Sequence, residues 1–151
     1  MPNWCTNEVD IYGGDNLEQF KQFVDECIVI KPFGLIKTWT LEFEKVIPYP
    51  PEAPSRDDLT PDSTMEERMN HPYQKWFNDF GYDWCIDNWG TKWSASEQDG
   101  DVLEDEAHLV FDTAWGPPVG IYNKLVEKYP DLSITWFYKE EGMEISGWLP
   151  E

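Results

Sequence analysis

The side chains best suited to chemistry are concentrated in residues 84–93, where three of the nine tryptophans stand beside a thiol and a lysine. Tryptophan carries a large apolar surface, and its N–H needs a partner when it is buried. Lys92 is the basic side chain of this segment. It can bind a carboxylate or a phosphate, or stack on Trp89 or Trp93 as a cation–π pair. The alternative is an exposed lysine beside packed indoles.

This segment predicts a ligand site if it meets residues 3–4 and 113–115 at one end of a sheet. Amide, hydroxyl and ammonium groups would then converge on an aromatic pocket, the usual composition of a small-molecule or peptide site. The candidate ligand-binding residues are Asn3, Trp4, Asn88, Trp89, Thr91, Lys92, Trp93, Thr113 and Trp115. The competing interpretation, which we favour, is that the same indoles form the core of a small domain. Asn88 also suits a left-handed helix end, with Gly90 making the turn.

Thiol chemistry has little support in the sequence. The three cysteines, Cys5, Cys27 and Cys85, are widely spaced, so they indicate neither a disulfide framework nor a Cys-x-x-Cys metal site. A thiolate nucleophile needs a base, and no spacing links His71 or His108 to a cysteine. We therefore expect buried, inert thiols.

Metal binding and the familiar catalytic motifs are also unsupported. His108, Asp112 and the acidic stretch 97–106 offer ligands, but their spacing matches no EF-hand loop or zinc motif. No catalytic triad, phosphate-binding loop or dinucleotide-binding glycine pattern is present. The sequence predicts no catalytic residue, no metal and no cofactor.

The charge of the chain bears on its partners. Eleven Lys and Arg stand against thirty Asp and Glu, a formal net charge of −19. Such a field repels phosphates and anionic lipids, so direct binding to nucleic acids or membranes is disfavoured. It attracts basic proteins, and a basic host protein is one expected partner. Two interpretations of the charge stay open. The charge serves solubility alone, or the protein imitates DNA and occupies the basic site of a nucleic-acid-binding protein.

The length of 151 residues predicts a single domain, 1–151, with one core. The first residues show no basic start or apolar run, and no stretch approaches ~18 consecutive apolar residues. We expect a soluble cytoplasmic protein with reduced thiols.

The first half of the chain contains clear secondary-structure patterns. Residues 5–12 alternate as a strand does, and Asp15 with Glu18 resembles a capping box before a helix that runs to Ile28. Apolar residues within 38–47 predict a second strand.

Five prolines follow, which indicates a Pro-rich acidic insertion at about 48–72. Beyond it, aromatic residues at helical spacing predict a helix over residues 73–85, with a bend or break at Gly81. The remaining predicted elements are strands at 91–96 and 107–115, an acidic turn at 97–106, a helix after Pro117-Pro118, and strands at 132–138 and 143–149.

This order predicts an α+β fold of the ferredoxin-like, split β-α-β kind. A mostly antiparallel sheet carries two helices on one face, plus the inserted helix. The other sheet face then needs a cover, and the candidates are the inserted helix, a second copy in a homodimer, or a ligand.

With these motifs placed, the chain resembles the YubB or Api92-like proteins of phages, prophages and plasmids, a family of uncharacterised function. The resemblance spans nearly the whole chain. It is carried by residues 1–7, 84–93 and 111–118, by Glu140-Glu141 and by Gly147. It implies a ferredoxin-like backbone and a mobile-element origin.

The functional expectation is a non-enzymatic binding or protein-interaction module with a strongly acidic surface. The alternative is a small-molecule binder or enzyme that uses the aromatic pocket around residues 88–93.

Overall fold

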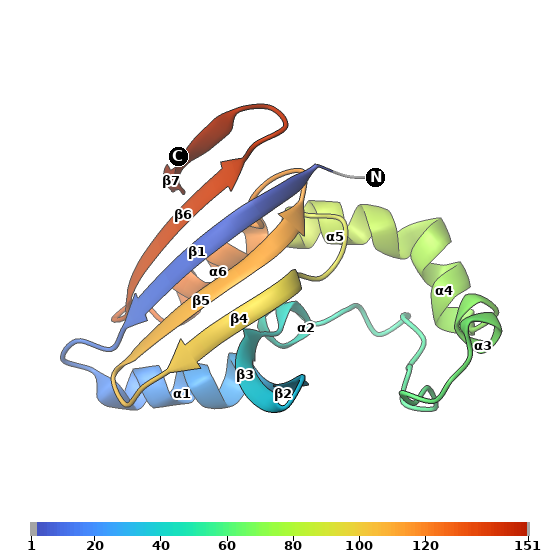
Figure 1. Cartoon of the computed structure of the whole chain (residues 1–151), viewed down its shortest axis with the longest axis horizontal. Helices are drawn as coiled ribbons and strands as arrows, with labels where there is room; N and C mark the ends of the chain where they lie inside the picture. Colours follow the sequence, from blue (N-terminus) through green and yellow to red (C-terminus); the bar gives the residue numbers. More distant parts are fainter. Residues whose placement is uncertain (1–2, 151) are drawn as a thin grey trace.

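The computed structural model describes residues 3–150 and contains a five-stranded sheet, a separate hairpin and a helical insertion (Figure 1). In spatial order the main sheet consists of β4 (Ser96–Val102), β5 (Glu106–Ala114), β1 (Trp4–Tyr12), β6 (Ser133–Glu140) and β7 (Ile145–Leu149). Each neighbouring pair is antiparallel. Met1 and Pro2, which begin the first motif of the resemblance, lie outside the described residues.

The central strand β1 follows the alternation that predicted it. Cys5, Asn7, Val9 and Ile11 are buried on one face, and the residues between them point to the other. Side chains alternate across a strand because its backbone is pleated. The predicted strand and its inward face are confirmed.

The topology is the predicted ferredoxin-like one. β5 and β6 are parallel to each other on either side of β1, and α6 (Val119–Lys128) connects them. β1 and β4 are likewise parallel with β5 between them, and α1 (Leu17–Cys27) begins that connection. Both helices lie behind the sheet in Figure 1. Two interleaved crossovers of this kind define a split β-α-β fold.

Helix α1 buries Phe20, Phe23 and Cys27 against the sheet. Its N-cap is Asn16 and not the predicted Asp15, because the Asn16 side-chain oxygen accepts the Gln19 N–H at 3.0 Å. An asparagine one residue closer to the helix reaches this free N–H group. The predicted helix is confirmed with a corrected start.

The segment after α1 differs from the prediction. Instead of one strand over 38–47, β2 (Ile28–Phe33) and β3 (Ile36–Leu41) form a separate two-stranded sheet, followed by the short helix α2 (Phe43–Val46). Gly34, at φ 64°, makes the turn. Phe43 and Val46 are both buried three residues apart, a helical spacing that the expected strand could not satisfy.

A second correction concerns residues 91–106. The expected short strand at 91–96 is irregular, with bends at 91–93, and β4 begins only at Ser96. The expected acidic turn is largely this edge strand. Asp99 and Asp101 project to solvent from β4, while the side chain of Gln98 accepts the Leu41 N–H at 3.0 Å. In register these two carboxylates lie opposite Val110 and His108, on the sheet face that carries no helix, so water can solvate them.

Between α2 and β4 the chain leaves the sheet. It contains α3 (Met65–Met69) and then three consecutive helical segments: α4 (Pro72–Trp76), the π-helical η1 (Phe77–Gly81) and α5 (Tyr82–Trp89). Figure 1 shows these helices extending to one side of the sheet. The predicted helix is confirmed, but the expected bend at Gly81 is a π-helical turn. A Cβ there would lie 2.5 Å from the Trp76 ring, so this ring occupies the space that a larger side chain would need.

The C-terminal hairpin of β6 and β7 confirms the two strands predicted there. Its loop is closed by Glu140, which is fully buried and whose carboxylate accepts the N–H groups of Gly142 at 2.9 Å and Met143 at 2.6 Å. Backbone N–H groups can satisfy a buried carboxylate in this way.

The face of the main sheet opposite α1 and α6 has no helix of residues 3–150 over it (Figure 1). The inserted helix, one of the three expected covers, packs with its last segment α5 against α6 instead. Tyr12, Val110 and Trp148 are exposed on this side of the structure. None of the helices within the described part of the chain is long and apolar enough to cross a lipid bilayer.

Candidate functional site

The tryptophan-rich segment lies where α5 ends. Trp89 is the last helical residue, and Gly90 follows in the left-handed region at φ 86° with its N–H donated to the Cys85 carbonyl. A Cβ on Gly90 would lie 2.7 Å from the Val119 nitrogen, so glycine is required there for two reasons. Asn88 stays helical, which corrects the expectation of a left-handed Asn88. Its side-chain amide donates to a carbonyl within the helix.

Trp89 belongs to the core. Its side chain is fully buried, and its Nε1 donates to the Ile47 carbonyl at 2.9 Å. The ring stacks on Tyr49 with 5.2 Å between centroids and meets Phe43 and Trp84 edge to face. The Trp89 side chain therefore contacts other residues of the core and has no exposed surface for a ligand.

Lys92 is held among aromatic rings at the surface. Its Nζ lies 4.6 Å from the centre of the Trp93 ring, 5.5 Å from that of Trp115 and 5.6 Å from that of Tyr82. Trp4 extends the group by contact with Trp93. The ammonium occupies the electron-rich ring faces that a cationic ligand would need. Of the roles that the sequence left open for Lys92, the structure shows the cation–π contact with Trp93.

The two candidate hydroxyl groups point inward. Thr91 is buried and donates to the Ala114 carbonyl at 3.2 Å, and Thr113 is fully buried and donates to the Gly116 carbonyl at 2.6 Å. Thr113 also accepts the side-chain N–H of Asn7 at 2.9 Å. Neither hydroxyl faces a ligand space.

Asn7 is a polar residue whose role sequence reasoning missed. It is fully buried in the middle of β1, where its Oδ1 accepts the Trp136 Nε1–H at 3.0 Å while its Nδ2 donates to Thr113. The available signal was an amide at an inward position of an alternating strand. A buried amide must be hydrogen-bonded, so Asn7 specifies how the sheet and its aromatic core fit together.

The candidate residues therefore divide into two groups. Those gathered at the surface are Trp4, Lys92, Trp93 and Trp115, with Asn3 joined to Trp115 through a backbone hydrogen bond of 2.8 Å. Those directed into the core or along a helix are Asn88, Trp89, Thr91 and Thr113.

The cysteines are free and fully buried. Burial raises the pKa of Cys5 to about 11 and that of Cys85 to about 12, and it also raises the pKa of Cys27. The thiolate is the reactive form of cysteine, so these thiols are unsuited to nucleophilic chemistry near neutral pH.

We therefore predict that the folded protein does not react with a thiol reagent at about pH 8, near the ordinary cysteine pKa. All three thiols should react after unfolding in denaturant, which is the matched control. Rapid modification of even one thiol in the native state would contradict this prediction, because it would show that the core opens to the reagent.

The two histidines have carboxylate partners. The Nε2 of His71 lies 2.8 Å from Asp58, and the Nδ1 of His108 lies 2.6 Å from Asp10. The hydrogen bond to Asp10 raises the pKa of His108. Among the described residues, no group of three or more His, Cys, Asp or Glu side chains is arranged to hold a metal ion.

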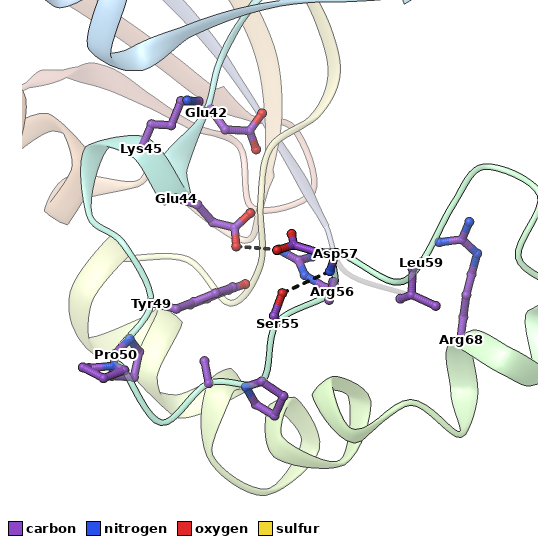
Figure 2. A pocket seen from close by; sticks show the side chains of 13 residues that line it. Glu42, Glu44, Lys45, Tyr49, Pro50, Ser55, Arg56, Asp57, Leu59 and Arg68 are labelled. Atoms are coloured by element: carbon purple, nitrogen blue, oxygen red, sulfur yellow. Dashed lines mark hydrogen bonds and ion pairs between the residues drawn. The ribbon is translucent and has the colours of Figure 1, made fainter.

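A cavity of about 670 Å³ lies between α2 and residues 48–62, which we call the Pro-rich loop (Figure 2). Its charged lining is mixed, consisting of Glu42, Glu44, Lys45, Arg56, Asp57 and Arg68. Carboxylates and basic groups balance here, so the cavity selects for neither cations nor anions by charge alone.

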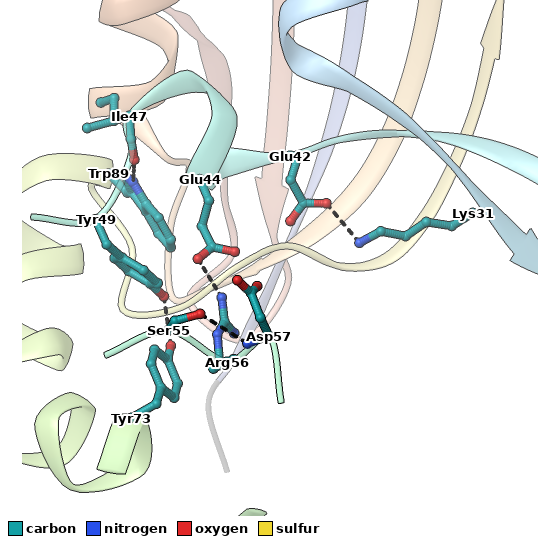
Figure 3. A network of polar contacts seen from close by, with 10 residues as sticks. All are labelled: Lys31, Glu42, Glu44, Ile47, Tyr49, Ser55, Arg56, Asp57, Tyr73 and Trp89. Carbon is teal, nitrogen blue, oxygen red and sulfur yellow. Dashed lines mark hydrogen bonds and ion pairs between the residues drawn. The ribbon is translucent and has the colours of Figure 1, made fainter. Parts of the chain in front are cut away.

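Figure 3 shows that the central cation of this cavity is already engaged. Arg56 pairs with Glu44, and its guanidinium carbon lies 4.3 Å from the centre of the Tyr73 ring and 5.8 Å from that of Tyr49. The hydroxyls of Tyr49 and Tyr73 are 2.9 Å apart. Arg56 therefore fastens the Pro-rich loop to α2 and α4.

A second cavity, of about 480 Å³, lies between the inserted helix (α4, η1 and α5) and the start of the Pro-rich loop. We call it the aromatic groove, and its lining consists of Pro50, Glu52, Trp76, Phe80, Asp83, Trp84 and Asp87. The sequence predicted these aromatic rings as one apolar helix face, but not that the face borders an open cavity. The missed signal was the pair of carboxylates at 83 and 87, which share the helix face of the rings.

The structure thus defines an α+β protein with a split β-α-β sheet and a helical insertion. Its segment 88–148, from the end of α5 into β7, matches the family model described as the ferredoxin-like domain in Api92-like protein. Over these residues the match confirms the predicted resemblance. No curated protein and no solved structure matches the chain.

Proposed function

We propose that this protein is a non-enzymatic binding module of a mobile genetic element and that its acidic surface takes up a basic segment of another protein. The observation that carries the proposal is the unbalanced surface charge. Most carboxylates whose side chains the structure describes have no basic partner within ion-pairing distance. More than half of the Lys and Arg side chains are already paired.

An excess of unpaired charge acts over distance. It attracts a basic partner and speeds the encounter, and it repels nucleic acids and other polyanions. The non-enzymatic part is supported by the buried thiols, the paired histidines and the inward hydroxyls. The mobile-element part rests on the resemblance alone.

The test is capture of host proteins by the purified full chain at about 0.1 M and about 1 M salt, where the Debye length falls from about 10 Å to about 3 Å. We expect partners of high positive charge at low salt, released at high salt. A neutral protein of similar size serves as the control bait. Partners that are acidic, or that survive high salt unchanged, would count against the proposal. Release by added DNA would identify imitation of DNA as the form of binding.

A further inference from the structure

We propose that the aromatic groove is the docking point for an arginine side chain of that basic segment. This inference rests on the proposed function and adds a place and a ligand chemistry to it. It follows from the rings of the groove, their support and the charges around them.

The rings form a line along the helix. Trp76, Phe80 and Trp84 follow one another at four-residue steps, so they share one helix face. Phe80 is 66% exposed, and the two indoles are half-buried. Behind them, Tyr49 meets Trp76 at 5.4 Å and Trp84 at 5.3 Å between ring centroids, both edge to face. The indoles are therefore held from the inner side while they line the cavity.

Gly81 contributes to this support. Because it has no side chain, the Trp76 ring can lie against the helix backbone within the π-helical turn. A glycine inside a helix costs about 1 kcal/mol relative to alanine, so its presence calls for a local reason. Accommodation of Trp76 supplies that reason.

The charges of the groove are all negative. Glu52 comes from the Pro-rich loop, and Asp83 and Asp87 come from α5 one helical turn apart. Within residues 3–150, no Lys, Arg or His side chain lies within ion-pairing distance of these three carboxylates. Aromatic faces beside unpaired carboxylates favour a cation.

The same molecule contains the completed form of this arrangement. Arg56 places its guanidinium over the Tyr73 ring and pairs with Glu44. At the surface, Lys92 likewise fills its own group of aromatic rings. The aromatic groove offers rings and carboxylates of the same kind without a cation from the described residues.

Arginine fits the groove better than lysine. Its planar guanidinium stacks on an aromatic face and can bind two carboxylate oxygens at once, whereas lysine is a compact, strongly hydrated point charge. The groove volume of about 480 Å³ lies within the range of ordinary ligand sites.

The experiment titrates the full chain with three synthetic peptides of otherwise identical sequence. One carries arginine at a chosen set of positions, the second carries lysine there, and the third carries the neutral analogue citrulline. Tryptophan fluorescence reports binding. We expect the arginine peptide to bind most tightly. Asp83→Asn with Asp87→Asn should weaken its binding by about tenfold or more, as expected for lost charge-assisted hydrogen bonds. Phe80→Ala should weaken it by about threefold.

The matched control is Glu18→Gln with Asp25→Asn, which removes the same charge from exposed positions of α1. It should change binding by less than about twofold, because separated surface charges are screened. Equal weakening by both pairs, or equal binding of the lysine peptide, would overturn arginine docking and leave the proposed function standing. If the wild-type chain binds none of the peptides, and captures no basic host protein, both proposals fail.

Discussion

Replacing Trp89 with alanine is expected to lower the free energy of unfolding by about 3–5 kcal/mol, the usual cost of removing a large buried aromatic side chain. The indole is fully buried, contacts three aromatic rings and donates to the Ile47 carbonyl. Its loss leaves a cavity where the inserted helix meets the core, and it leaves that carbonyl without this partner. A domain of this size is stable by only about 5–15 kcal/mol, so much of the margin disappears.

Chemical denaturation followed by circular dichroism measures this loss. The control is Trp148→Ala, because Trp148 is 58% exposed and its removal should cost less than about 1 kcal/mol. Unchanged stability of Trp89→Ala would refute the structural role of Trp89 and restore it as a candidate ligand residue.

The second large effect is expected from Gly120→Ala. Gly120 lies in the first turn of α6, where a Cβ would overlap the Asn88 carbonyl oxygen and lie 3.0 Å from the Trp89 carbonyl carbon. Neither obstacle is a flexible side chain, so the ends of α5 and α6 would have to move apart. Overpacking of this kind costs about 1–3 kcal/mol and sometimes more. Because the shift would also disturb Trp89, we expect a value at the upper end.

Gly116→Ala is the matched control for this substitution. A Cβ at Gly116 meets no atom within 4 Å. Its free energy of unfolding should stay within about 0.5 kcal/mol of the wild-type value. Equal melting temperatures for the two variants would show that the helix ends adjust freely and would contradict the close packing of α5 on α6.

The elements that sequence reasoning predicted correctly carry strong periodic patterns. β1, β5 and the C-terminal strands alternate, and α1 and α6 repeat apolar residues at helical spacing. The errors lie where tertiary contacts override the pattern. β4 is rich in carboxylates, and Asp99 and Asp101 are tolerated there because they lie on the sheet face that no helix covers. The strand predicted at 38–47 contains the second half of β3, but β2 was missed because Ile28 continues the apolar pattern of α1 into the next element.

The candidate site was predictable to a similar degree. The contact of Lys92 with Trp93 follows from their proximity in the sequence, but the inward direction of Trp89 depends on Ile47 and Tyr49, which are distant in the sequence. The aromatic groove depends on the Pro-rich loop, whose path local patterns do not determine. Long-range packing therefore decides which indoles belong to the core and which line a surface.

The contact between Trp76 and Gly81 has a consequence for how related sequences can diverge. The indole lies where a side chain at position 81 would have to be. A chain with alanine or a larger residue at 81 must therefore carry a smaller residue at 76, or give up the π-helical turn. We expect the two positions to vary together among homologues.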